Sequence, residues 1–418
     1  MGIEEPEGTG SKDALDIVRP IWTLLSQSVD LDKQESTIKL RSTDKYFFNS
    51  TLTNNSIELW IDGAKVATNG TTGRNITIIG TTPIYETWII NGVSSQVQIG
   101  VEYEIKATGF DIDKQQAKIK IPQGTITDQS GNSSAEMEFI LYSCLMPATQ
   151  ETAPGGATTA FLKNPYGIQR QNIESITFVS GLGTADKTKW WDVSAVQDGS
   201  IMAWYKDADG NGAYEVYIGS DGGIFANPDS SYLFSEIGSA TVCEAEDVIN
   251  SLSLLNTKRV TNMEEMFYNC GSKAMTSLDL GSNFDTGNVT NMAGMFSGCG
   301  QNAMTELNLG SKFNTSNVTD MSNMFNGCGQ NVMTSFIVAE KTNILDFIIT
   351  TQEDKEVNMS GMFQNFGQKL ESLTLGENFD TSKVTNMSNM FNGTGKTSMK
   401  TLTLGNNFNT SAVQSMNS

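Results

Sequence analysis

Hydrophobic positions in the second half of the chain recur with a regular period. The motif Val-Thr-Asn-Met begins at position 260, returns at 289, 318 (as Val-Thr-Asp-Met) and 384, and has looser copies at 357–359 and 413–416. Its methionines lie at 263, 292, 321, 359, 387 and 416, so that the numbering advances by 29, 29, 38, 28 and 29 in turn. A Met-Phe pair follows five of these methionines three residues later. An internal period of this length predicts a repeat architecture.

Each repeat unit combines two apolar patterns. Leu278-Asp279-Leu280 alternates with a period of two, which predicts a short strand with both leucines on one face. From Val289 to Cys299 the apolar residues are spaced three or four apart, which predicts a helix of about three turns that ends at Gly300. One strand and one helix cannot bury their apolar faces alone. We therefore expect the units to stack as a leucine-rich-repeat solenoid.

Stacking would align equivalent apolar side chains of successive units into a buried structural ladder. Methionine and phenylalanine at this spacing indicate a packed core. No catalytic, cofactor-binding or metal-binding residue is assigned in the chain. The residues assigned to the ladder are Leu278, Leu280, Phe284, Met292, Phe296, Leu307, Leu309, Phe313, Met321, Phe325, Leu373, Leu375, Met387 and Phe391.

Three of the five cysteines, Cys270, Cys299 and Cys328, occupy the same repeat position. If strands set the rise between units, these cysteines lie roughly 5 Å from one another, close enough for a disulfide or a metal ligand ladder. Later units place Phe366 and Thr394 at this position, and phenylalanine cannot serve as a ligand. We therefore expect buried free thiols that act as small apolar fillers.

The first third of the chain has a different pattern. Short, roughly alternating runs at 57–61, 76–79, 97–99, 117–121 and 137–141 predict strands, and Asp62-Gly63 and Asn91-Gly92 are among the turn signals between them. Several short strands over about 125 residues favour an antiparallel β-sandwich. Cys144 has no partner cysteine in this segment, so an inter-sheet disulfide is excluded.

These patterns divide the chain into five segments and predict an α+β multidomain protein. A flexible N-terminal segment covers 1–18, the sandwich 19–145, a linker rich in small residues and proline 146–165, a β-rich cap 166–228, and the repeats 229–418. The cap would cover the first apolar edge of the stack.

Composition and charge narrow the function classes. Lys and Arg number 27 against 47 Asp and Glu, and the resulting net charge of −20 argues against binding to nucleic acid or anionic lipid. The absence of histidine excludes Ser-His-Asp and Cys-His nucleophiles and HExxH zinc sites. Apolar runs of about 18 residues do not occur, so no membrane insertion is expected for this chain.

The repeat resembles a known family. Residues 313–325, Phe-Asn-Thr-Ser-Asn-Val-Thr-Asp-Met-Ser-Asn-Met-Phe, are similar to the BspA-like leucine-rich-repeat surface proteins of bacteria, and the similarity extends over about 173–418. Residues 124–132, Gly-Thr-Ile-Thr-Asp-Gln-Ser-Gly-Asn, resemble part of bacterial immunoglobulin-like domains. The resemblance implies a cell-surface or secreted protein whose partner is a host protein or glycan.

Both ends of the sequence fit a piece of a longer protein. The residues after Met1 lack the basic and apolar regions of a signal peptide, and Met416 is followed by only two residues, before the Met-Phe pair of its unit. We expect the native chain to continue beyond residue 418.

Three short motifs imitate catalytic or binding sites. Residues 207–212, Asp-Ala-Asp-Gly-Asn-Gly, match the start of a calcium loop, but Ile218 stands where the bidentate glutamate is needed, so a β-turn is favoured. Residues 393–397 resemble a phosphate loop, but Met390 replaces its first glycine. Glu264 and Glu265 could form a carboxylate pair; other units hold Ala, Gly, Ser and Asn there, which favours a solvated face.

The step of the fourth unit is 38 residues, nine more than 29, and the unit includes the segment 341–349. Insertions in repeat proteins often map to a binding face. A tolerated bulge explains the insertion equally well. We expect a non-enzymatic interaction module that binds through the repeat surface. The alternatives are a polysaccharide-degrading enzyme that uses paired carboxylates and a purely structural surface stalk.

The buried ladder generates the first prediction. Met292→Asp places an unpaired charge among shared contacts and should unfold several repeats together, whereas Glu264→Gln on a solvated face should change stability by less than about 0.5 kcal/mol. Thermal unfolding followed by circular dichroism measures both. Equal tolerance of the two substitutions would contradict the repeat assignment.

Overall fold

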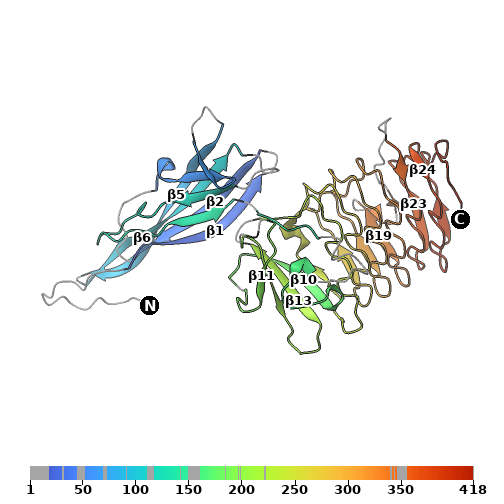
Figure 1. Ribbon diagram of the computed structural model, residues 1–418, viewed down its shortest axis with the longest axis horizontal. Coiled ribbons are helices and arrows are strands. Elements are labelled where there is room, and N and C mark those ends of the chain that lie inside the picture. Colours follow the sequence, from blue (N-terminus) through green and yellow to red (C-terminus); the bar gives the residue numbers. More distant parts are fainter. Residues whose placement is uncertain are drawn as a thin grey trace. The chain divides into compact units, whose positions relative to one another are not determined.

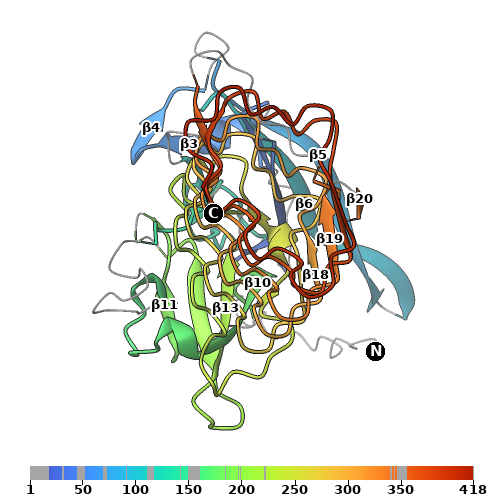
Figure 2. The same ribbon diagram turned by 90° about the vertical axis from the view of Figure 1, so that its right-hand side faces the viewer.

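The computed structural model describes residues 18–30, 33–44, 52–68, 73–90, 92–110, 117–141, 143–148, 161–183, 185–195, 197, 199–220, 223–338, 341–342, 344–345 and 355–417 (Figures 1 and 2). The chain divides into two compact units. The first contains residues 1–143 with 221–223, and the second contains 144–220 with 224–418.

The first unit consists of two four-stranded antiparallel sheets. One has the order β1-β2-β6-β5, with β1 (Ile21–Asp30), β2 (Glu35–Thr43), β6 (Val93–Thr108) and β5 (Asn75–Ile90). The other has the order β4-β3-β7-β8, with β4 (Ala64–Val66), β3 (Glu58–Ile61), β7 (Ala117–Ile121) and β8 (Met137–Ile140), and a short 3₁₀ turn, η1 (Asn54–Ser56), precedes it.

Alternation of buried and partly exposed residues along these strands places the core on one face of each sheet. Leu59 on β3 and Ile119 on β7 are buried and pair across the ladder, and Tyr103 on β6 is buried as well. The Leu52 N–H donates to the Tyr103 hydroxyl at 3.3 Å, and the Ser36 Oγ donates to the Leu141 carbonyl at 3.2 Å. These bonds satisfy polar groups inside the core.

The second unit begins with a β-rich region that extends past the predicted cap boundary at 228, because strands at 249–250 and 255–256 belong to its sheets. Its larger sheet has the order β11-β12-β13-β10-β15, formed by β11 (Trp190–Asp192), β12 (Met202–Lys206), β13 (Tyr214–Ser220), β10 (Ile173–Ser180) and β15 (Ile249–Asn250). A small sheet joins β16 (Leu255–Asn256), β14 (Ile224–Phe225) and β9 (Ser143–Cys144), and short 3₁₀ turns lie at η3 (Phe161–Lys163), η4 (Arg170–Asn172) and η5 (Leu252–Leu254).

The predicted linker 146–165 is shorter than expected. Met146 and Ala148 at its start and Phe161 and Leu162 at its end are buried, and three of them belong to the core of the second unit. Burial of large apolar side chains stabilises these flanks as part of the cap. Residues 149–160, the remainder of the linker, lie outside the described residues, as do 1–17 of the N-terminal segment.

Successive repeats pair through short parallel strands. One parallel sheet contains β17 (Ser277–Asp279), β18 (Glu306–Asn308) and β19 (Ser335–Val338). Strand β20 (Lys341–Thr342) pairs antiparallel with β19 at the edge of this sheet. A second sheet contains β21 (Ile344–Leu345), β23 (Ser372–Leu375) and β25 (Thr401–Thr403), and a third contains β22 (Val357–Asn358) and β24 (Val384–Asn386). Leu278 pairs with Leu307, and Leu307 with Phe336, so equivalent residues are in register.

The segment predicted to be a helix is a series of turns. Met295 and Ser297 donate their N–H groups to carbonyls three residues earlier, at 3.1 and 2.9 Å. The N–H groups of Phe296 and Gly298, which alternate with them, donate instead to carbonyls of the next unit, both at 2.8 Å. No α-helix occurs among the described residues, so the α component of the predicted α+β class is wrong.

Backbone conformation explains this difference. Gly294 and Gly298 have φ angles of +63° and +68°, and equivalent left-handed residues recur in each unit, for example Asn323 and Gly327. An α-helix requires right-handed residues throughout, so these positions cannot lie in one. Because each turn also advances three residues, it produces the same apolar spacing as a helix.

Hydrogen bonds of buried threonine side chains also join successive units. The Thr286 Oγ1 donates to the Asn314 carbonyl at 2.8 Å and accepts the Asn314 N–H at 2.7 Å. Thr257 and Thr381 make the same pair of bonds to the equivalent residue of the following unit. All three threonines are buried, and each hydroxyl satisfies both backbone groups of one residue in the following unit.

This geometry predicts that Thr286→Val destabilises the protein by about 1–3 kcal/mol, because it removes a buried hydroxyl that pairs with both the N–H and the carbonyl of Asn314. Thr290→Val is the matched control. Thr290 is exposed, and its hydroxyl donates to the Thr261 carbonyl. The Thr290 N–H donates to the same carbonyl at 2.8 Å, so this carbonyl keeps a partner when the hydroxyl is removed. Chemical denaturation compares the two variants, and similar losses of stability would contradict the role of the buried hydroxyl.

Candidate functional site

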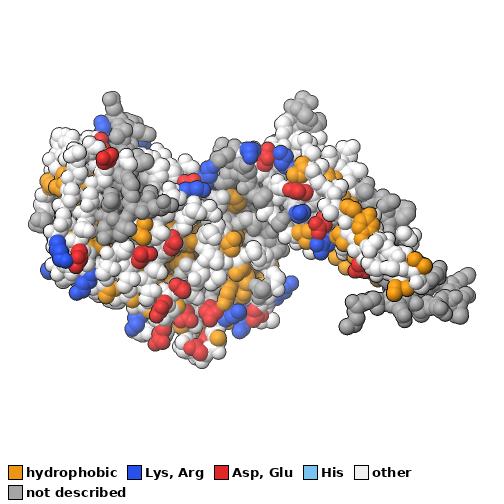
Figure 3. Space-filling view, turned by 180° about the vertical axis from the view of Figure 1, so that it is seen from behind, with side chains coloured by type: hydrophobic (Ala, Val, Ile, Leu, Met, Phe, Trp, Pro, Cys, Tyr) orange, Lys and Arg blue, Asp and Glu red, His pale blue; other side chains and the backbone are white. Residues whose placement is uncertain are grey.

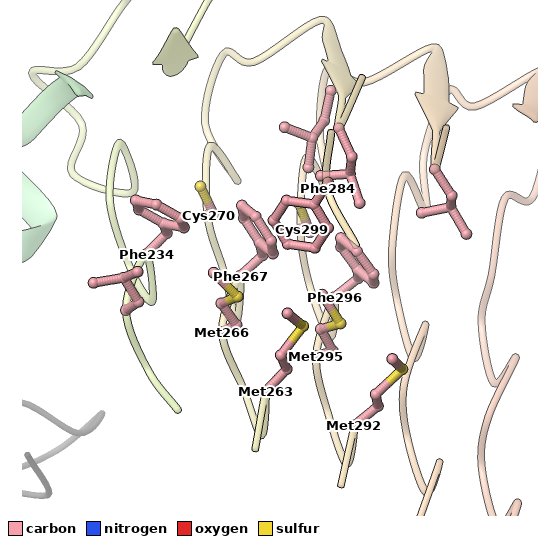
Figure 4. Close-up of a cluster of buried hydrophobic side chains, with 14 of the residues drawn as sticks. Phe234, Met263, Met266, Phe267, Cys270, Phe284, Met292, Met295, Phe296 and Cys299 are labelled. Carbon is pink, nitrogen blue, oxygen red and sulfur yellow. The ribbon is translucent and has the colours of Figure 1, made fainter. Parts of the chain in front are cut away.

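The ladder residues lie inside the repeats, as Figure 4 shows for Phe284, Met292 and Phe296. All fourteen are buried except Phe391, which is partly buried. The phenylalanines after the motif methionines form a continuous stack in which the rings of Phe267, Phe296, Phe325, Phe363 and Phe391 are 5.3–5.5 Å apart and within 7° of parallel. Such offset stacking adds to the stabilisation from burial.

The cysteine column lies beside this stack. Cys270, Cys299 and Cys328 are fully buried and free. Burial raises the pKa of the Cys270 and Cys299 thiols well above its usual value, so both stay protonated. In the next unit Phe366 takes this position, and its ring packs edge-to-face on the Phe336 ring with the ring centroids 5.2 Å apart. The column therefore fills space, as expected for a position that holds cysteine in three units and phenylalanine in the next.

A buried arginine lies where the cap meets the first repeat, and nothing in its sequence context indicates it. The Arg170 Nη1 donates to the carbonyls of Leu233 and Ser235 at 3.2 and 3.0 Å, and its guanidinium lies 5.5 Å from the Phe161 ring. Its Nε and Nη2 atoms have no hydrogen-bond partner among the described residues. Burial lowers the pKa of Arg170 to about 10, while the nearby Glu236 opposes this shift. Arg170 thus joins the cap to the first repeat.

The carboxylates that could form a catalytic pair share one turn. Partial burial raises the pKa of Glu265, and the negative charges of Glu264 and Glu236 add to this shift. The Glu264 carboxylate accepts a hydrogen bond from the Asn291 side chain at 3.2 Å. Neighbouring carboxylates on one turn do not face each other across a substrate, as glycoside hydrolysis requires.

The loop that resembles a calcium site is a self-contained turn between β12 and β13. The Asp207 carboxylate accepts the Gly210 N–H at 2.8 Å, and the Asp209 carboxylate accepts the backbone and side-chain N–H groups of Asn211 at 3.2 and 2.8 Å. The Glu215 carboxylate accepts the Tyr217 hydroxyl at 2.6 Å, and burial together with this bond raises the pKa of Tyr217 to about 12. Hydrogen bonds within the turn therefore account for the acidic residues of this loop.

The segment that resembles a phosphate loop is part of the repeat turns. The Gly395 N–H donates to the Phe366 carbonyl at 3.1 Å, and the Thr397 Oγ1 donates to the Gln368 carbonyl at 2.6 Å. A Cβ on Gly393 would lie 2.4 Å from the Asn365 Oδ1. The glycines therefore allow close approach of successive units, and the loop's donors already bind the preceding unit.

The insertion in the fourth unit is described only in part. The backbone forms the short strands β20 and β21, while 343 and 346–354 lie outside the described residues. The hypothesis that 341–349 bind a partner therefore remains a prediction.

Solvent-facing side chains of the parallel strands form the most regular surface of the repeats. On β17 Ser277 and Asp279 are exposed, and on β18 Glu306 is exposed at the position equivalent to Ser277. We call Ser277, Asp279, Glu306 and Asn308 the strand face. On the side shown in Figure 3, uncharged polar and backbone atoms cover most of the repeats, with scattered Lys, Arg, Asp and Glu between them.

Comparison with known proteins gives one family match. The family described as "Mycoplasma protein of unknown function, DUF285" matches residues 237–353 and 354–418, which is less than half of the chain. No curated protein and no solved structure matches the sequence. The boundary between the two matched segments falls in the long fourth unit. Among the described residues, no helix is long and apolar enough to span a membrane.

The thiol environments give a pH prediction. Cys144 is the one described cysteine that is not fully buried, and burial raises its pKa to about 11. Because the thiolate is the reactive form, its modification rate in the native protein should rise about tenfold per pH unit from pH 8 to 10. In the unfolded chain the rate should level off near pH 9. A native rate that also levels off near pH 9 would contradict the buried environment.

Proposed function

We propose that this protein is a non-enzymatic interaction module, displayed on a cell surface or secreted, that binds a host protein or glycan through its repeat surface. In this proposal the repeats form a leucine-rich-repeat solenoid of the BspA-like type, and the first unit is an immunoglobulin-like domain. The similarity of residues 313–325 to that family supports the assignment, and the antiparallel sheets of the first unit are compatible with it.

The observation that carries the proposal is that different side chains of each repeat fill the interior, join the units and face solvent. Apolar and thiol side chains fill the interior, and backbone and threonine bonds join the units. The side chains of the strand face take no part in either task, and the register of β17 and β18 places them in rows with the spacing of neighbouring strands, about 4.8 Å. A rigid polar surface of this kind binds through many hydrogen bonds over a large area.

A polysaccharide-degrading enzyme is the second candidate, and the raised pKa of Glu265 favours it because a general acid needs such a shift. The position of Glu264 beside it on the same turn weakens this candidate. Glu265→Gln would abolish release of reducing sugar from a polysaccharide if the enzyme hypothesis is correct.

The binding proposal predicts a ligand on glycan or protein arrays probed with the full chain. Ser277→Lys combined with Glu306→Lys should weaken that binding about tenfold or more, because it places new charge on the strand face. Ser282→Lys, an equally exposed serine in the same repeat but outside the strand, is the matched control and should leave affinity unchanged. An array without any ligand, or equal loss in both variants, would contradict the proposal.

A further inference from the structure

The hairpin of β5 and β6 extends well beyond the sheet to which it belongs (Figure 1). Strand β2 pairs with β6 only from Gly100 onward, whereas β5 continues to pair with β6 as far as Ile90 and Val93. Six residues of β5 and seven of β6 therefore form a two-stranded ribbon about 20 Å long. We call residues 85–90 and 93–99 the distal ribbon.

The distal ribbon is almost without charge. Its thirteen residues contain one charged side chain, Glu86, in a chain whose net charge is −20. Its apolar side chains are nevertheless open to solvent: Tyr85 is 53% exposed, Ile89 52% and Val93 63%. Figure 3 shows hydrophobic side chains at this end of the first unit. Large apolar groups held in water at a projecting end indicate a surface that docks on something apolar.

Both faces of the ribbon carry apolar groups near its end. Ile89 pairs with Ser94 and Ile90 pairs with Val93, so that Ile89 and Val93 belong to consecutive cross-strand pairs and point to opposite faces. A flat protein partner or a sugar ring would cover only one of these faces. A bilayer surrounds whatever enters it and covers both.

The larger side chains of the ribbon become more polar away from the turn. Ile89 and Val93 lie near the turn, with Ser94 opposite Ile89, and Trp88 follows; Glu86, farther along β5, accepts the Trp88 Nε1–H at 3.2 Å. Across a membrane surface the same order is found, from acyl chains through the aromatic-rich interface to water. The strand edges of the ribbon carry unpaired backbone groups that must stay hydrated, which limits entry to the headgroup region and its boundary with the acyl chains.

From this geometry we propose that the distal ribbon docks on a neutral lipid bilayer, with Ile89 and Val93 entering the boundary between headgroups and acyl chains and with Trp88 and Tyr85 in the interface. The acidic chain repels anionic lipid, so zwitterionic lipid is the preferred surface. The expectation of no membrane insertion rested on the absence of a long apolar run, which a shallow anchor does not need.

Sedimentation of the full chain with phosphatidylcholine vesicles tests the proposal. The wild type should bind, and Ile89→Ser combined with Val93→Ser should lower the partition coefficient about tenfold or more. Ile79→Ser is the matched control, because Ile79 is 49% exposed on the same strand but lies in the body of the sheet. It should retain binding within about twofold. Replacing part of the lipid with phosphatidylserine should weaken binding.

Fluorescence gives a second readout. Brominated phosphatidylcholine should quench part of the tryptophan emission of the wild type, and Trp88→Phe, which keeps an aromatic ring, should remove that quenching while the protein still binds. Unchanged melting curves show that the exposed substitutions leave the fold intact. The strand-face variants of the array experiment change residues of the other unit, so the two proposals can fail separately.

A wild-type chain that stays in the supernatant would overturn the proposal, as would equal loss of binding in Ile79→Ser. If vesicles do not bind and the wild type instead forms a dimer that the Ile89 and Val93 double variant cannot form, the ribbon is an interface between copies and the lipid assignment is wrong. A glycan that binds the ribbon in place of vesicles would overturn it in the same way.

Discussion

The stack of repeats depends on backbone hydrogen bonds that run from each repeat to the next. In the turn segment every second N–H donates to a carbonyl of the following repeat, for example from Phe296 to Met324 at 2.8 Å. A single repeat, whose strands are only two to four residues long, cannot satisfy its own backbone. The stacked phenylalanines, the buried threonines and the left-handed glycines all follow from this requirement, because each brings two repeats close enough for those bonds.

The sequence predicted the repeat more fully than its local structure. The period, the phase and the apolar interior could be derived because identical residues recur at fixed steps. The helix was wrong because a spacing of three residues fits both a helix and consecutive turns. Gly294 and Gly298, repeated as Asn323 and Gly327, were the available signal, since glycine and asparagine tolerate positive φ. In the first unit β1 and β2 were missed, although Ile38 and Leu40 alternate with polar residues.

The candidate site was harder to predict than the fold. Ladder positions are fixed by burial, which a hydrophobic pattern reveals, whereas the chemistry of a polar group depends on neighbours distant in sequence. Arg170 illustrates this: its partners Leu233 and Ser235 are more than sixty residues away. The calcium-like loop shows the reverse case, because Asp207 and Asp209 bind groups within three residues and the sequence alone favoured a turn.

The stack tolerates changes in the length of its repeats. Phe325 and Phe363 are separated by the long step of 38 residues, yet their rings are 5.4 Å apart, compared with 5.3 Å between Phe296 and Phe325 across a step of 29. Extra residues are therefore accommodated outside the packed column. Recombination that duplicates or deletes a whole repeat would bring together two surfaces that already match. The reach of such a protein could thus evolve by copy number, without the redesign of any contact.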